Sequence, residues 1–103
     1  MNCFSYSGGF GLAGLVGNPA LRTVNVDSSA PALELARRNY ALNGHDPAAH
    51  SFEERDVTRY LQAANDTGQR FDLVVVDPPA YARSNAKKER ALHAFAARRD
   101  WIV

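Results

Sequence analysis

Apolar residues along the chain fall into short runs rather than one long hydrophobic stretch. The clearest run is Leu73 to Val76, four aliphatic residues followed at once by Asp77 and Pro78-Pro79. A run of this length, rich in β-branched residues and closed by prolines, is typical of a strand buried on both faces. Such strands lie in parallel sheets with helices above and below. The pattern predicts a buried parallel strand that carries Asp77 to its carboxyl end.

Three earlier segments are also predicted to be strands, and a helical pattern follows each strand. The predicted strands span residues 2–6, 23–27, 51–55 and 73–76. The predicted helices span residues 10–16, from Ser28-Ser29 to about residue 42, from Asp56 to Thr67-Gly68, and about residues 87–99. Ser28-Ser29 and Pro31 suit the start of the second helix, and Asn43-Gly44 suit its end. Asp56 suits the N-cap of the third helix, and residues 46–50 are predicted to be a loop.

This alternation of strands and helices defines the predicted fold class. Successive strand–helix–strand units form right-handed crossovers in a doubly wound parallel sheet. The prediction is an α/β, Rossmann-like fold with about four strands, the N-terminal half of a complete doubly wound sheet. Because the first strand begins almost at Met1 and the sheet stops at half its usual size, we expect a fragment of a longer domain, truncated at both ends. The strand at residues 73–76 is then a possible open edge.

Composition restricts the class of protein. The chain has 103 residues, of which 46% are hydrophobic and 22% charged, as in one small soluble globular domain. It has no run of about 18 apolar residues and no N-terminal signal pattern, so we expect no membrane contact and a cytoplasmic location. The single cysteine, Cys3, excludes an internal disulfide and a cysteine-based metal site. No metal site is predicted.

Basic residues are concentrated near the C-terminus. From Arg83 onward the chain has six basic and two acidic residues, whereas residues 1–82 have six basic and nine acidic ones. The basic segment 83–99 is suited to contact the phosphates of RNA. The alternative, a solvated helix face, is favoured when charge alone is considered.

Polar motifs follow the carboxyl end of every predicted strand, where ligands bind in open parallel sheets. Gly8-Gly9 lets a ligand approach the backbone and the amides of a helix N-terminus. Asp27 lies 18 residues beyond Gly9, near the spacing of an acid that accepts hydrogen bonds from ribose hydroxyls. Each motif also has a structural alternative: a simple turn for the glycines, and helix caps for Asp27 and Asp56. Asp77 is poorly placed to cap a helix and is the strongest candidate for chemistry.

Taken together, these motifs resemble the S-adenosylmethionine-dependent methyltransferases of large-subunit ribosomal RNA. That family has an RlmI-like branch, which acts on cytosine C5, and an RlmK-like branch, which acts on guanine N7. The resemblance is carried by residues 2–10, 26–28, 42–44, 56–57 and 71–84. It implies a class I methyltransferase domain with S-adenosyl-L-methionine as cofactor and ribosomal RNA as partner. It leaves the oligomeric state open.

The resemblance also implies roles for individual residues. The segment from Phe4 to Phe10 would cradle the methionine end of the cofactor, through Phe4, Ser5, Tyr6, Gly8, Gly9 and Phe10. Asp27, with Ser28 beside it, would hold the ribose hydroxyls, and Asp56 with Val57 would meet the adenine. Near the methyl group, the target base would face Asp77, Pro78, Pro79 and Tyr81, with Asp77 also close to the cofactor. The base must be unstacked to reach that position.

Departures from the family pattern bear on the target base. Cytosine C5 enzymes first add a cysteine to the ring. Ala80 occupies the position beside Pro79, and Cys3 lies in the segment expected to form the cofactor loop, so such a cysteine would have to come from outside this chain. Residues 98–101 look slightly more like the RlmK-like branch, whose guanine nitrogen needs no covalent step.

Two alternative functions remain open from the sequence. Residues 9–14 fit G-x-G-x-x-G, and Asp27 fits the ribose acid of that fingerprint, so an NAD(P)-dependent oxidoreductase is the main enzymatic alternative. It leaves Asp77-Pro78-Pro79 unexplained. The other alternative is an inactive truncated remnant, and we expect the chain to be inactive on its own. The histidines, His45, His50 and His93, are expected to be surface residues rather than ligands.

Overall fold

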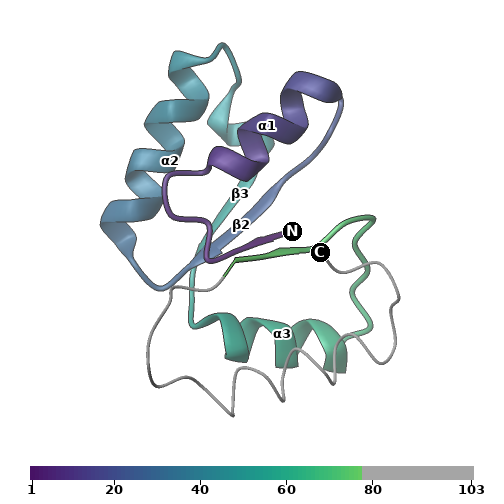
Figure 1. Cartoon of the computed structure of the whole chain (residues 1–103). Helices are drawn as coiled ribbons and strands as arrows, with labels where there is room; N and C mark the ends of the chain where they lie inside the picture. Colours follow the sequence, from purple (N-terminus) through teal and green to yellow (C-terminus); the bar gives the residue numbers. More distant parts are fainter. Residues whose placement is uncertain (78–103) are drawn as a thin grey trace.

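The fold is an α/β sandwich around one parallel sheet, as the sequence predicts. The computed structural model describes residues 1–77 (Figure 1). Its strands are β1 (Asn2–Cys3), β2 (Val24–Asp27), β3 (Ser51–Glu54) and β4 (Val75–Val76), in the order β3-β2-β1-β4. Its helices are α1 (Gly9–Gly17), α2 (Ala30–Leu42) and α3 (Val57–Asp66). The predicted last helix, at residues 87–99, lies outside the described residues.

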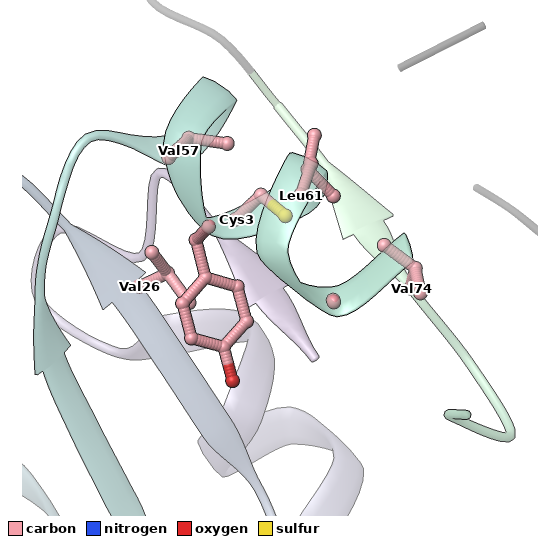
Figure 2. Packing of buried hydrophobic residues seen from close by; sticks show 7 residues of the cluster. Cys3, Val26, Val57, Leu61 and Val74 are labelled. Carbon is pink, nitrogen blue, oxygen red and sulfur yellow. The ribbon is translucent and has the colours of Figure 1, made fainter. Parts of the chain in front are cut away.

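The sheet separates two layers of helices. Helices α1 and α2 lie on one side of the sheet, and α3 lies on the other (Figure 1). On the α3 side, the side chains of Val57 and Leu61 face Cys3 and Val26 of the sheet (Figure 2). These side chains are at most 4% exposed. Since a buried aliphatic side chain contributes about 1.5–3 kcal/mol, this apolar layer holds the sheet and α3 together.

Helix α2 begins and ends at the residues that the sequence indicates. Its N-cap is Ser29, whose Oγ accepts a hydrogen bond from the Ala32 amide at 3.2 Å, and Pro31 lies in its first turn. It ends before Asn43-Gly44, where Gly44 has a φ of 79°. The predicted loop 46–50 is wrong in one respect. It contains a 3₁₀ turn, η1 (Pro47–Ala49), because the carboxylate of Asp46 accepts a hydrogen bond from the Ala48 amide.

Strands β1 and β4 are shorter than predicted. The first strand ends at Cys3 instead of residue 6, because Phe4 and Tyr6 have left-handed backbones with φ of 56° and 45°. Strand β4 begins at Val75 instead of residue 73, and just before it Val74 is fully buried on the α3 side whereas Leu73 is 50% exposed. The prediction that residues 73–76 are buried on both faces is therefore wrong, since Leu73 is exposed and both residues of β4 are only partly buried. Within residues 1–77 β4 is an edge strand, as expected.

The order of the strands places a topological switch point between β1 and β4. From β1 the chain proceeds outward to β2 and β3, and it then returns to the opposite side of β1 to form β4. The crevice at such a point, outside the carboxyl ends of the strands, is where open α/β sheets bind ligands. No helix within residues 1–77 is long and apolar enough to cross a membrane.

Candidate functional site

The four polar motifs of the sequence meet at one edge of the sheet. All the strands are parallel, with Cys3 opposite both Val26 and Val76, and Asp27 opposite Glu54. The segments that follow the strands therefore leave the sheet at its carboxyl edge. They are the β1–α1 loop (residues 4–8), Asp27, Asp56 and Asp77.

The β1–α1 loop has an unusual backbone. Phe4, Tyr6 and Gly8 all have positive φ, at 56°, 45° and 80°. A left-handed backbone is costly for a non-glycine residue and is concentrated at functional sites. Ser5 N donates a hydrogen bond to Val26 O at 3.0 Å, which anchors the loop to β2, and Gly8 N donates to Ser5 O at 2.8 Å, which closes a turn within the loop.

The loop leads directly into the N-terminus of α1, where polar groups are available to a ligand. Gly8 is the N-cap and provides no side-chain hydrogen bond, so the N-cap residue leaves the first amides of α1 without a side-chain partner. Gly9 and Phe10 are exposed there. The hydroxyl of Ser5 is buried and has no hydrogen-bond partner within residues 1–77. Uncapped amides and a buried hydroxyl suit the polar end of a small ligand.

Asp27 connects the end of β2 to this loop. Its Oδ2 accepts a hydrogen bond from the Tyr6 amide at 3.0 Å, and its Oδ1 accepts one from the Ser29 amide at 2.9 Å. Since Ser29 is the N-cap of α2, Asp27 is not itself the cap. A carboxylate has about four acceptor positions, so these two bonds leave capacity for the hydroxyls of a sugar. Ser28, the other residue predicted here, is exposed.

Asp56 and Val57 have clear structural roles. Asp56 is the N-cap of α3, and its Oδ1 accepts a hydrogen bond from the Arg59 amide at 3.1 Å. The Val57 side chain is 4% exposed and packs in the apolar layer of Figure 2. Because the Val57 side chain is buried, only its main-chain amide could contact a ligand at this edge.

Asp77 is exposed and directly follows β4. Cys3 pairs with Val76, and these are the last residues of the adjacent strands β1 and β4. Phe4 and Asp77, which directly follow them, therefore leave the sheet side by side. The carboxylate is thus carried to the switch point beside the β1–α1 loop. The other residues predicted to face the base, Pro78, Pro79 and Tyr81, lie outside the described residues, as do Ala80 and the basic segment 83–99.

Cys3 is not part of the loop, contrary to the expectation from the sequence. It lies in β1 and is fully buried on the α3 side of the sheet. Burial raises the pKa of its thiol to about 12. A thiol in this environment stays protonated and is a poor nucleophile.

Sequence reasoning missed the contacts of three polar residues on the α1 and α2 side of the sheet. Asn39 donates from Nδ2 to Ser7 O at 3.0 Å, and Tyr40 is hydrogen-bonded through its hydroxyl. His50, expected at the surface, is partly buried, and its Nδ1 accepts a hydrogen bond from Thr23 N at 3.1 Å. Burial lowers the pKa of His50 below its usual 6.5. No local pattern marks these contacts, which join residues far apart in the sequence.

A cavity of about 300 Å³ lies beneath α1, at a distance from these motifs. Its lining includes Gly14 and Leu21 on the α1 side and Leu73 and Val75 beside β4. Of the residues predicted to bind the cofactor, Phe10 alone lines it. The cavity is therefore separate from the candidate site.

Comparisons with known proteins agree on one class of enzyme. The family model of S-adenosylmethionine-dependent methyltransferases matches residues 1–95. The chain is 46% identical over 87 residues to ribosomal RNA large subunit methyltransferase I of Aeromonas salmonicida, covering 84% of this chain and 22% of that protein. The corresponding Vibrio cholerae protein is 45% identical over 97 residues, covering 92% of this chain and 24% of its own length. The chain thus spans about a quarter or less of the curated relatives it matches.

Two solved structures share the fold. The crystal structure of SMU.776, complexed with SAH, has a TM-score of 0.72 and 31% identity, and the match covers 81% of this chain and 22% of that one. The SAM-dependent methyltransferase of Agrobacterium tumefaciens has a TM-score of 0.68 and 27% identity, with 80% and 26% covered. With the family model matching nearly the whole sequence, the chain belongs to the S-adenosylmethionine-dependent methyltransferase family.

Proposed function

We propose that this chain is the cofactor-binding part of a methyltransferase that modifies a base of large-subunit ribosomal RNA. The observation that carries the proposal is the hydrogen bond between the β1–α1 loop, which follows β1 at the switch point, and Asp27 at the carboxyl end of β2. The relatives named above support ribosomal RNA as the substrate. With such a substrate, we also propose the cytoplasm as the location.

The residues at the carboxyl edge fit S-adenosyl-L-methionine. The uncapped amides of α1 and the buried hydroxyl of Ser5 would receive the methionine end. Asp27 would accept hydrogen bonds from the ribose hydroxyls with its remaining acceptor positions. Asp56 and the Val57 amide would meet the adenine. When bound, the cofactor supplies an activated methyl group, and these residues would fix its direction.

Asp77 would then lie beside the target base. Its exposure and its place next to the β1–α1 loop support this role. Methyl transfer needs mainly two partners held in line, so positioning accounts for much of the rate. Pro78, Pro79 and Tyr81 would shape the base pocket, and the basic segment 83–99 would contact RNA phosphates; the resemblance alone supports these roles.

The acceptor atom is the point at which the two branches of the family differ. Transfer to cytosine C5 requires a cysteine nucleophile. Cys3 is the one cysteine of this sequence, and its burial removes it from that role. Cytosine chemistry would therefore need a cysteine from another part of a longer protein, whereas transfer to guanine N7 would not. Nucleoside analysis of the methylated RNA distinguishes the two products.

The glycines that suggested an oxidoreductase have another explanation. A Cβ at Gly11 would overlap the hydroxyl of Tyr40, and a Cβ at Gly14 would lie 2.9 Å from Leu21 Cδ2. Both glycines thus allow α1 to pack closely, without a role at the ligand edge. The glycine pattern therefore needs no dinucleotide to explain it, and the family match favours S-adenosylmethionine over a nicotinamide cofactor.

The test has a binding step and a transfer step. The chain should retain tritiated S-adenosyl-L-methionine and no NAD in equilibrium dialysis, and the reverse result would end the proposal. For transfer, residues 1–95 would replace the matching segment of the Aeromonas salmonicida relative, and the chimera would be assayed on ribosomal RNA. Asp77→Ala should abolish methylation, whereas Asp66→Ala, at the far end of α3, should not. Undiminished methylation by Asp77→Ala would refute its role.

A further inference from the structure

The C-terminal half of α2 lies directly behind the β1–α1 loop. Asn39 Nδ2 donates a hydrogen bond to Ser7 O at 3.0 Å, across 32 positions of the sequence. Gly8 packs against the same helix, since a Cβ there would be 3.1 Å from both Ala36 Cβ and Tyr40 Cε1. The loop therefore rests on a surface formed by Ala36, Asn39 and Tyr40, which we call the α2 surface.

Tyr40 ties the α2 surface to the sheet. Its side chain is fully buried, and its hydroxyl lies 2.8 Å from Thr23 Oγ1 and accepts a hydrogen bond from Asn25 Nδ2 at 3.1 Å. Asn25 Nδ2 also approaches Ser51 O at 3.3 Å, which extends the network to β3. A buried, satisfied network of this kind fixes one arrangement of its members. The position of Tyr40, and of the glycines packed on it, is thereby set by the sheet.

The loop needs such external support. Phe4 and Tyr6 are non-glycine residues in the left-handed region, a conformation that persists only where surrounding contacts impose it. The contact of Tyr6 with Asp27 restrains the loop from the β2 side. The α2 surface restrains it from behind, at Ser7 and Gly8.

We propose that Asn39 and Tyr40 are positioning residues, which hold the β1–α1 loop in the shape that binds the methionine end of the cofactor. The inference rests on the proposed function for the identity of the ligand. Neither residue is assigned a contact with the cofactor, and their effect is transmitted through Ser7, Gly8 and Gly11. Without them, the binding-competent shape is populated only part of the time, and the apparent affinity falls by that fraction.

The decisive variant is Asn39→Asp in the 103-residue chain, because a carboxylate cannot donate to Ser7 O. The matched control is Asn43→Asp. Asn43 also makes an amide hydrogen bond at this end of α2, to Asn39 O at 2.7 Å, but that bond does not reach the loop. Both variants place the same negative charge near the C-terminus of α2, where it is unfavourable. Only Asn39→Asp removes the hydrogen bond to Ser7 O that supports the loop.

Two readouts separate positioning from simple stabilisation of α2. Calorimetry with S-adenosylhomocysteine, the demethylated cofactor, should show Kd raised about 2- to 12-fold in Asn39→Asp, the range for one lost hydrogen bond, and unchanged in Asn43→Asp. Hydrogen exchange should be faster at the Tyr6 and Gly8 amides in Asn39→Asp alone. Thermal unfolding should show both variants destabilised.

The opposing result is equally clear. If Asn39→Asp lowers the unfolding midpoint as Asn43→Asp does, but leaves Kd and loop exchange unchanged, Asn39 only stabilises α2 and the proposal is overturned. If the unmodified chain binds no S-adenosylhomocysteine, the proposed function fails, and loop exchange still decides whether Asn39 positions the loop. Should Asn39→Asp fail to fold, Tyr40→Phe, which keeps the ring but removes the hydroxyl, gives the same two readouts.

Discussion

The Asp27 carboxylate bonds the β1–α1 loop to the end of β2, and Asp27→Asn tests its role. The wild-type carboxylate accepts hydrogen bonds from the Tyr6 and Ser29 amides through separate oxygens. An asparagine has one oxygen and one NH₂ group, so it can keep only one of these bonds. It also loses the charge that would favour the ribose hydroxyls.

The structure predicts a small effect on stability and a larger one on affinity. A hydrogen bond to a charged group is worth about 1.5–3 kcal/mol, and the solvent-exposed Tyr6–Asp27 bond should contribute at the lower end of that range. Tyr6, once released, can leave its φ of 45° and recover about 1 kcal/mol of backbone strain. The free energy of unfolding should therefore change by no more than about 1 kcal/mol. Binding loses both the sugar contact and the loop anchor, so Kd should rise about 10- to 150-fold.

Calorimetry with S-adenosylhomocysteine and urea unfolding measure these two quantities on the same sample. Asp46→Asn is a matched control, since Asp46 Oδ1 accepts a comparable hydrogen bond from the Ala48 amide in the η1 turn, before β3. The control should bind with wild-type affinity within about twofold. Equal affinities for Asp27→Asn and wild type, or an equal loss in Asp46→Asn, would refute the reasoning.

Three further outcomes are expected from buried groups. Because burial lowers the pKa of His50 below 6.5, the unfolded chain binds the proton more readily, and the free energy of unfolding should fall as the pH drops below 6.5. Urea unfolding at about pH 7.5 and about pH 5.5 should show a smaller fall in His50→Gln, and an equal fall would contradict this account. Cys3, with its pKa raised to about 12, should resist iodoacetamide at neutral pH until the chain is unfolded in urea; native modification would show that it is accessible. Gly11→Ala should cost about 1–3 kcal/mol by overlap with the Tyr40 hydroxyl, and Tyr40→Phe should relieve part of that cost. Additive effects, within about 0.5 kcal/mol, would argue against the overlap.

The helices could be predicted from the sequence because the interactions that bound them are local. Ser29 and Asp56 cap amides three residues ahead, so the cap residue and the first turn can be recognised in a short window. The parallel sheet followed from the same elements, since alternating strands and helices allow few other arrangements. The convergence of the polar motifs was then a consequence of topology, as parallel strands share one carboxyl edge.

The backbone of the β1–α1 loop could not be predicted in this way. Phe4 and Tyr6 are residue types that rarely adopt positive φ, and the predicted strand continued through both of them. Their conformation depends on partners elsewhere in the chain: Val26 O, which accepts from the Ser5 amide, and the carboxylate of Asp27. Contacts of this kind appear only once β1 and β2 are paired in the correct register.

The two faces of the sheet have different roles: the α3 face forms the apolar core, and the other face holds Tyr40 in place behind the β1–α1 loop. Neighbouring residues of a strand point to opposite faces, and in β1 and β2 the α3 face carries Cys3 and Val26, whereas the other carries Asn2 and Asn25. Central parallel strands are normally apolar on both faces, because each buried polar group must find a partner. Asn25 meets that requirement through the hydroxyl of Tyr40, against which the glycines of the loop and of α1 pack. An apolar residue at position 25 would satisfy the rule for buried strands, but it would leave the Tyr40 ring without this restraint. The departure from the usual pattern is therefore best explained by the need to hold a ligand-binding loop in an unfavourable backbone conformation.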